Sequence, residues 1–138
     1  MAKIYKYRKI TDRYTTHTLV EPDHAATGNG ERITEICAID GWTYVSVPDT
    51  MVLPDQPAII SETLQKVDLE KESAAIIAAS PVCQSISGRV VDMIRERYTV
   101  NDEIKMLRIG PSDETSEYND YVEACRAWGR EEKTRLGL

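Results

Sequence analysis

The chain contains no phenylalanine among its 138 residues. Its aromatic side chains are seven tyrosines and two tryptophans, and each carries an O–H or N–H group that needs a partner when it is buried. The positions of these residues are therefore the main test of whether the aromatic side chains form the core or a contact surface. With 41% hydrophobic and 29% charged residues, the sequence is typical of a folded chain, and its length suits one domain of ordinary size.

Two further absences and the net charge narrow the functional class of the protein. No run of about 18 apolar residues occurs, so we expect no transmembrane helix. The N-terminal residues contain no apolar segment, so we expect no secretory signal and a cytoplasmic location. The net charge of −6 argues against a general nucleic-acid-binding protein, because phosphate affinity comes from clustered Lys and Arg. Neither a membrane nor a nucleic acid is therefore an expected partner.

The charge is unevenly distributed along the chain. Residues 1–20 carry five Lys or Arg against one Asp, whereas residues 21–72 carry eleven Asp or Glu against three Lys or Arg. Each run is typical of a solvated face. The alternative is that the basic arm packs on the acidic middle, within one chain or between neighbouring chains.

The first third of the chain has the pattern of β-structure. Residues 3–10 alternate loosely and are rich in Tyr and Ile, which predicts a strand. Asp40-Gly41 lies between two further β-rich runs, residues 32–39 and 42–47. This pattern predicts a hairpin, because a type I′ turn needs a positive φ at both central residues.

A two-residue turn also fixes the register of the hairpin. The predicted pairs are Ile39 with Trp42, Cys37 with Tyr44, and Ile36 with Val45. Side chains alternate between the faces of a sheet, which gives one face with Cys37, Ile39, Trp42 and Tyr44 and another with Ile36, Ala38 and Val45. In one interpretation both faces are covered, and in the other one face is a contact surface.

The sequence changes character after the hairpin. Pro48, Pro54 and Pro57 lie within ten residues and predict an extended connector, because proline cannot donate to a β-ladder and disfavours a helix before it. Beyond residue 61 apolar residues recur at helical spacing, and Ser80-Pro81 predicts an N-cap followed by the first residue of a helix. Helices are expected over residues 69–79, from 81, from 101 and from 112.

We therefore predict an α+β fold. It comprises a small N-terminal antiparallel β region with a hairpin (residues 1–47), a Pro-rich connector (48–60) and a C-terminal bundle of three to four helices (61–138). The β region is too small to be expected to fold alone, so the parts either form one composite domain or remain separate regions. The mostly charged residues 126–138 predict a solvated helix end with a frayed tail.

Three widely spaced cysteines provide the thiols of the chain. They form no CxxC motif and no cluster with histidine, so we expect no zinc site. An odd number of cysteines is typical of reduced thiols in a cytoplasmic protein. A nucleophilic cysteine would need a base, and the two imidazoles are His17 and His24. The cysteines are Cys37, Cys83 and Cys125.

Two further patterns are weak signals. Gly28-Asn29-Gly30 predicts a flexible turn rather than a phosphate loop, because a strand follows it and not a helix. The adjacent carboxylates Asp102-Glu103 and Glu131-Glu132 point about 100° apart on a helix and do not converge.

We therefore predict a non-enzymatic protein with no catalytic residue, no cofactor and no metal, and keep a small cytoplasmic enzyme with a Cys or carboxylate centre as the alternative. A helical DNA-binding regulator is a weaker alternative, because acidic neighbours nearly neutralise its basic group of Arg95, Arg97, Lys105 and Arg108.

The remaining signal is the placement of the aromatic residues. Trp and Tyr are enriched at protein interfaces, and here they occur on the hairpin and in a stripe at helical spacing near the C-terminus. We therefore predict a protein-interaction module that binds a protein partner or a second copy of itself. A core role is the alternative for each ring, because without Phe these rings must also fill the interior. The candidate contact residues are Trp42, Tyr44, Tyr118, Tyr121 and Trp128.

Six short segments have a distinctive sequence: residues 35–48 (EICAIDGWTYVSVP), 53–57 (LPDQP), 78–81 (AASP), 95–98 (RERY), 102–105 (DEIK) and 121–130 (YVEACRAWGR). All six lie within residues 33–138, the part of the chain that resembles small, uncharacterised proteins encoded in the tail regions of bacteriophages and prophages. The last segment resembles the charged, Trp-containing helix that closes many tail-fibre and tail-assembly accessory proteins. The resemblance implies a virion component or assembly factor, made in the cytoplasm of the bacterial host, with phage structural proteins as partners. It implies no catalytic residue.

Overall fold

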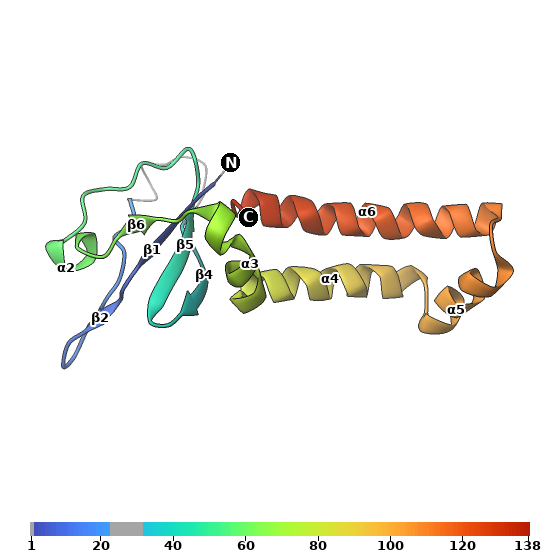
Figure 1. Ribbon diagram of the computed structural model, residues 1–138, viewed down its shortest axis with the longest axis horizontal. Coiled ribbons are helices and arrows are strands. Elements are labelled where there is room, and N and C mark those ends of the chain that lie inside the picture. The colour runs from blue at the N-terminus through green and yellow to red at the C-terminus, as the bar shows by residue number, and fades with distance from the viewer. Residues whose placement is uncertain (1, 23–31) are drawn as a thin grey trace. The chain divides into compact units, whose positions relative to one another are not determined.

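The computed structural model describes residues 2–22 and 32–138, and its architecture is α+β, as the sequence predicts (Figure 1). His24 and Gly28-Asn29-Gly30 lie outside the described residues. The chain divides into two compact units, residues 1–83 with 134–138 and residues 84–133. The elements are β1 (Lys3–Tyr7), β2 (Ile10–Thr11), β3 (Thr16–His17), β4 (Thr34–Ile39), β5 (Trp42–Val47), α2 (Ala58–Ser61), β6 (Gln65–Lys66), α3 (Leu69–Ala79), α4 (Pro81–Arg97), α5 (Val100–Ile109) and α6 (Asp113–Arg135).

The first unit is built on an antiparallel sheet with the strand order β4-β5-β1-β6. The predicted strand over residues 3–10 divides into β1 and β2, and β2 pairs with β3 in a second, small ladder. Because β1 lies inside the sheet, the basic arm packs on the acidic middle of the chain. Two ion pairs join them, Lys6 Nζ to Glu72 Oε1 at 3.1 Å and Lys9 Nζ to Glu35 Oε1 at 2.6 Å.

The hairpin of β4 and β5 has the predicted turn. Asp40 and Gly41 have φ angles of 50° and 81°, both positive, as a type I′ turn requires. Glycine adopts such a φ without strain, which explains its place at the second position. The predicted pairs next to the turn are confirmed: Ile39 with Trp42, and Cys37 with Tyr44.

The register changes at a β-bulge in β4. Ile36 is inserted as an extra residue, so Glu35 lies opposite Val45, and the predicted pair of Ile36 with Val45 is wrong. The side chain of Ile36 is buried in the same cluster as Cys37, not on the opposite face as predicted. At the bulge the hydroxyl of Ser80 donates a hydrogen bond to the carbonyl oxygen of Ile36 at 2.9 Å.

Ser80 links this edge strand to the start of α4. Its side chain is fully buried, and its Oγ accepts a hydrogen bond from the backbone N–H of Cys83 at 3.1 Å. Ser80 is therefore the predicted N-cap, with Pro81 at the first helical position. One hydroxyl thus accepts from a free N–H group of the helix end and donates to the carbonyl oxygen of Ile36.

Both faces of the sheet are covered within this unit, which agrees with the first interpretation of the hairpin. The connector contributes to this cover through Met51 and Ile60. One cluster contains Ile4, Ile36, Cys37, Tyr44, Val67 and Ile76. The other contains Tyr7, Leu19, Val45, Val47, Met51 and Ile60.

The C-terminal residues return to the sheet. The hydroxyl of Ser46 donates to the carbonyl oxygen of Leu136 at 2.8 Å, and Leu138 packs against the core cluster that contains Ile4. Gly137 has a φ of 92°, and a Cβ at this position would lie 2.5 Å from the carbonyl oxygen of Ala2. The prediction of a frayed tail is therefore wrong for residues 136–138.

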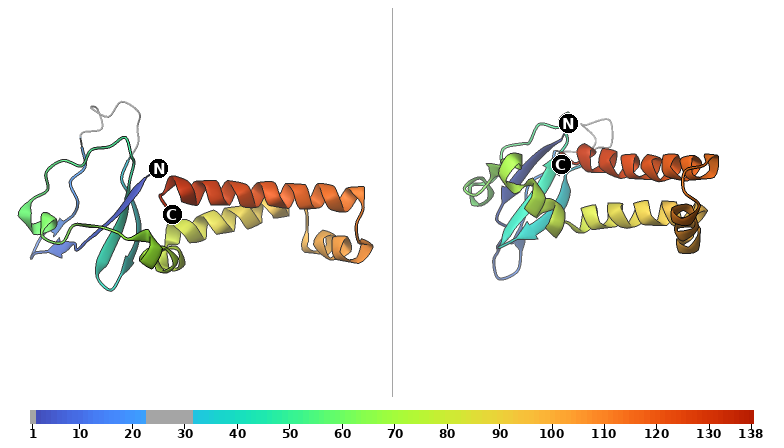
Figure 2. Two further views of the ribbon diagram at one scale, coloured as in Figure 1. Left: turned by 45° about the horizontal axis from the view of Figure 1, so that its top comes forward. Right: turned by 45° about the vertical axis from the view of Figure 1, so that its right-hand side comes forward.

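In the second unit α4 and α6 lie side by side and α5 connects them (Figure 2). Their shared core consists of buried Ile94, Val122 and Cys125 with half-buried neighbours on both helices. Gly129 is also buried, and a Cβ there would lie 2.7 Å from Cγ2 of Val90. The two helices therefore approach closely at this glycine.

Across residues 2–22 and 32–138, no single helix is both long and apolar enough to cross a membrane. α3 and α4 reach that length and composition only when the two are taken together as a bent pair.

Alanine substitutions at two helical glycines test the close approach of α4 and α6. Alanine favours a helix over glycine by about 1 kcal/mol. A Cβ at Gly88 meets no atom within 4 Å, so Gly88→Ala is expected to raise the free energy of unfolding by about that amount. A Cβ at Gly129 meets Val90, and overpacking costs about 1–3 kcal/mol, so Gly129→Ala is expected to lower it. Urea denaturation measures both changes, and equal stabilisation by the two substitutions would contradict the close approach.

Candidate functional site

Trp42 and Tyr44, two of the predicted contact residues, lie on β5 beside charged side chains from β1 and α3. The hydroxyl of Tyr44 donates to Oε1 of Glu72 at 3.0 Å, and Nζ of Lys6 donates to the same oxygen at 3.1 Å. Lys6 lies opposite Tyr44 in the ladder, so both side chains project from one face of the sheet. Tyr44 is 5% exposed, and its phenol is tied to a strand and a helix of its own unit.

The electrostatics of this cluster follow from the same contacts. Burial, together with the hydrogen bond to Glu72 and the charge of Glu72, raises the pKa of Tyr44 to about 12. The hydrogen bond from Lys6 holds the pKa of Glu72 below its ordinary value, and the bond from Tyr44 acts in the same direction. At neutral pH the cluster is therefore an ion pair beside a neutral phenol. Two donors already occupy one oxygen of Glu72, which fits a structural carboxylate better than a general base.

The ring of Trp42 is contacted by two cations. Nζ of Lys6 lies 5.0 Å from the ring centroid and Cζ of Arg8 lies 4.4 Å from it. Such cation–π contacts contribute about 0.5–1 kcal/mol at exposed sites. Trp42 is half-buried and also packs against the core cluster of Ile4, so much of its ring is used inside the sheet unit.

Tyr118 and Tyr121 of α6 pack in the core of the helical unit. The hydroxyl of Tyr118 donates to Oε1 of Glu103 at 2.8 Å, and the hydroxyl of Tyr121 donates to the carbonyl oxygen of Met93 at 2.7 Å. Both rings contact Tyr98, with centroid distances of 4.9 Å and 5.7 Å. Loss of solvent raises the pKa of both phenols. These two side chains therefore have internal partners for ring and hydroxyl alike.

Tyr98 is an aromatic core residue that the sequence analysis missed. Val90, Ile94 and Tyr98 recur at intervals of four, a spacing that extends the apolar face of α4 and could have revealed it. The backbone N–H of Tyr98 donates to Ile94 at 2.8 Å, so the helical hydrogen-bond pattern reaches it. Trp128, the fifth predicted contact residue, is half-buried elsewhere on α6, where Cζ of Arg89 lies 5.2 Å from its ring.

The structure thus separates the five predicted contact residues between the two units. It brings Trp42 and Tyr44 together on the sheet and Tyr118 and Tyr121 together on α6. Each ring is at least half-buried and has contacts within its own unit. Their role in binding a partner stays a prediction.

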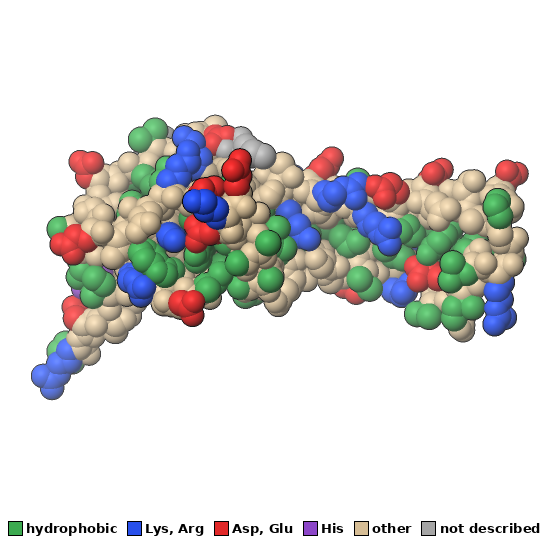
Figure 3. Space-filling model, viewed as in Figure 1, with side chains coloured by type: hydrophobic (Ala, Val, Ile, Leu, Met, Phe, Trp, Pro, Cys, Tyr) green, Lys and Arg blue, Asp and Glu red, His purple; other side chains and the backbone are tan. Residues whose placement is uncertain are grey.

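A row of exposed apolar side chains runs along α5. Val100 is 55% exposed, Ile104 43% and Leu107 86%, whereas Met106 on another side of the helix is buried. The spacing of i, i+4 and i+7 places the three exposed residues on one face. Hydrophobic side chains gather over α5 in the space-filling view (Figure 3). We call Val100, Ile104 and Leu107 the α5 row.

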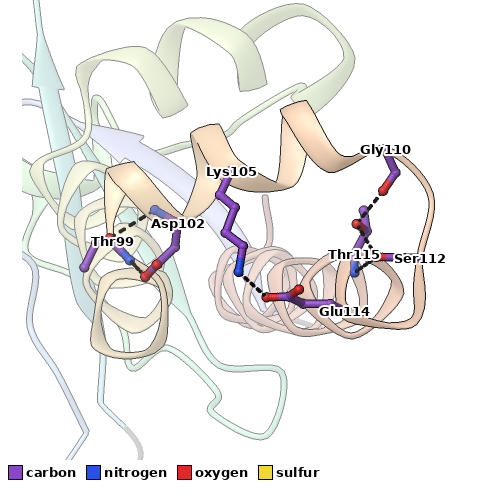
Figure 4. Close-up of polar contacts among 7 residues, drawn as sticks. All are labelled: Thr99, Asp102, Lys105, Gly110, Ser112, Glu114 and Thr115. Carbon is purple, nitrogen blue, oxygen red and sulfur yellow. Dashed lines mark hydrogen bonds and ion pairs between the residues drawn. The ribbon is translucent and has the colours of Figure 1, made fainter.

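α5 is held at both ends by polar contacts (Figure 4). At its start Thr99 and Asp102 form a capping box, in which each side chain accepts a hydrogen bond from the backbone N–H of the other. Nζ of Lys105 lies 3.0 Å from Oε1 of Glu114 on α6. Beyond its end the hydroxyl of Thr115 donates to the carbonyl oxygen of Gly110 at 2.7 Å. The α5 row is therefore carried by an anchored helix.

The basic group behind the DNA-binding alternative is largely neutralised by ion pairs. Three of its four cations contact carboxylates of the helical unit: Arg95 with Glu103, Arg97 with Glu117, and Lys105 with Glu114. These pairs leave little positive charge of this group for phosphate groups.

The three cysteines are all buried. Burial, with a smaller effect of the neighbouring Cys83, raises the pKa of the Cys37 thiol above its ordinary value. A raised pKa keeps a thiol protonated at neutral pH and weakens it as a nucleophile. Nε2 of His17 lies 3.0 Å from Oδ2 of Asp12, and the described residues contain no group of three His, Cys, Asp or Glu side chains that could hold a metal ion.

Thiol labelling tests the enzyme alternative. We expect the folded protein to react slowly with an alkylating reagent at neutral pH, because access to each buried sulfur needs local opening. Unfolding in guanidinium is expected to make all three cysteines react fast. Mass spectrometry of the labelled peptides measures each site, and one fast-reacting cysteine in the folded protein would support a Cys-centred enzyme instead.

Comparison with known proteins gives no match, either to a family model, to a curated protein or to a solved structure. The function is therefore argued from the residues of the chain itself.

Proposed function

We propose that the chain is a non-enzymatic protein-interaction module and that the α5 row is a contact surface. The observation that carries the proposal is the exposure of Leu107, at 86%, in a row with two further exposed apolar side chains of the same helix face. Aliphatic side chains exposed in a row are typical of a surface that a partner covers. Leu107 in particular contributes little to the fold, because Met106 is the buried side chain of α5.

The energetics of this surface favour binding to another apolar surface. Full burial of one Val, Leu or Ile side chain contributes about 1.5–3 kcal/mol. Apolar residues at i, i+4 and i+7 are also the ones that a helix typically buries when it enters an apolar groove or packs on another helix. Because α5 is anchored by its capping box and by Lys105, little conformational entropy is lost when it binds.

We further propose that the partner is a structural protein of a bacteriophage or prophage, or a second copy of this chain. This part of the proposal is supported by the sequence resemblance over residues 33–138 to phage tail-region proteins. It assigns the chain to a virion tail or to tail assembly, after synthesis in the cytoplasm of the bacterial host.

Replacing the α5 row by polar residues tests the contact surface. The double variant Ile104→Ser/Leu107→Ser is expected to weaken binding of the partner at least tenfold, because it removes two apolar side chains from the contact. The matched control is Val52→Ser, which removes an 85% exposed side chain from the other unit and is expected to bind like the unsubstituted chain. The thermal midpoints of all three proteins are expected to agree within a few degrees, because the substituted residues are exposed.

Sedimentation velocity measures self-association, and affinity capture from phage-producing cells measures binding of tail proteins. Equal binding by the double variant and the control would place the contact elsewhere. Failure of the unsubstituted chain to associate with itself or with a tail protein would overturn the proposal.

A further inference from the structure

A cleft of about 270 Å³ lies between α4 and α6 of the helical unit. Its floor is apolar and includes Ile86 and Val90 of α4. Gly129 of α6 also lines it, and the close approach of the helices at this residue closes the cleft from below. The cleft is open to solvent.

Three cations of α6 line the rim of this cleft. Arg126, Arg130 and Lys133 recur at i, i+4 and i+7, which places them on one face over about 10 Å of helix axis. Arg130 is paired with Glu123. Among the residues that the structure describes, no carboxylate lies within ion-pair distance of Arg126 or Lys133. Figure 3 shows Lys and Arg side chains beside hydrophobic ones along α6.

The row brings three like charges together, with Glu123 paired to Arg130 and the charge of Arg126 acting also on Glu103. Cations at i and i+4 repel one another and destabilise a helix. The row is also basic in a chain whose net charge is −6. A ligand that supplies carboxylates at the same spacing would remove the repulsion, and apolar side chains between them would cover the floor.

We propose that this cleft binds an acidic amphipathic helix of a partner protein. Carboxylates one turn apart would pair with Arg126, Arg130 and Lys133, while adjacent apolar side chains contact Ile86 and Val90. An anionic membrane would satisfy the cations but has no side chain of fixed spacing for the cleft. The cleft shares no residue with the α5 row, so this proposal stands independently of the proposed function.

The probe for the test is a synthetic peptide of about four helical turns, capped at both ends. Its Glu residues recur at intervals of four and three, beside a row of Leu residues. The control peptide has Gln in place of each Glu. Fluorescence anisotropy measures both dissociation constants with the full chain at low and moderate salt, and amide NMR spectra locate the binding site. We expect saturable binding of the Glu peptide, at least tenfold weaker binding of the Gln peptide, and a shift of the Gly129 amide signal on binding.

Charge-matched variants assign the effect to the rim. Arg126→Gln/Lys133→Gln is expected to weaken binding of the Glu peptide at least tenfold and to reduce its salt dependence. Lys66→Gln/Arg108→Gln removes the same charge at exposed positions outside the cleft and is expected to bind like the unsubstituted chain. Ile104→Ser/Leu107→Ser is likewise expected to bind the peptide unchanged, which separates this site from the α5 row.

Three results would overturn the proposal. The first is equal binding of the Glu and Gln peptides, and the second is binding without a shift at Gly129. The third is binding of phosphatidylglycerol vesicles that depends on Arg126 and Lys133 while the Glu peptide does not bind, which would indicate an anionic membrane surface instead.

Discussion

The structure depends on one constraint, which is that a tyrosine ring can be buried only where its hydroxyl finds a partner. Without phenylalanine, the aromatic rings available to fill the interior are those of Tyr and Trp, and each carries a polar group. Tyr7 accepts a hydrogen bond from the backbone N–H of Leu19, Tyr44 donates to Glu72, and Tyr121 donates to a carbonyl group of the facing helix. Among the described residues no buried side-chain N or O atom lacks a hydrogen-bond partner. The cores of both units are thus held by specific polar bonds as well as by apolar packing.

This constraint also decides which side chains are left for contacts with other molecules. Rings whose hydroxyl groups are bonded inside a unit are largely withdrawn from its surface. A row of exposed aliphatic side chains lies on α5, and Arg126 and Lys133 of α6, which have no carboxylate within ion-pair distance among the described residues, lie beside an apolar cleft. Function is therefore proposed for the helical unit, where anchored helices present residues at a fixed spacing.

Local features of the fold were predictable from the sequence, and contacts between distant residues were not. The turn at Asp40-Gly41 and the N-cap at Ser80 follow from the conformational preferences of a few adjacent residues. The bulge at Ile36 was not predictable, because its carbonyl group is satisfied by a side chain 44 residues further on. Leu107 and Met106 are neighbouring apolar residues of α5, and only the packing shows that Met106 is buried and Leu107 exposed. The aromatic candidates lie on β5 and α6, and their internal partners were not foreseen for the same reason.

The most direct test of this account is a spectrophotometric titration of the seven tyrosines in the folded protein. We expect Tyr44 to ionise with a pKa of about 12, and the pKa values of Tyr118 and Tyr121 also to lie above the ordinary value of 10.0. The unfolded chain ionises first, so the stability that Tyr44 contributes is fully present below pH 10 and is lost as the pH rises towards 12. Ionisation of all seven tyrosines together near pH 10, in a protein that remains folded, would contradict the claim that the rings are bonded inside the units.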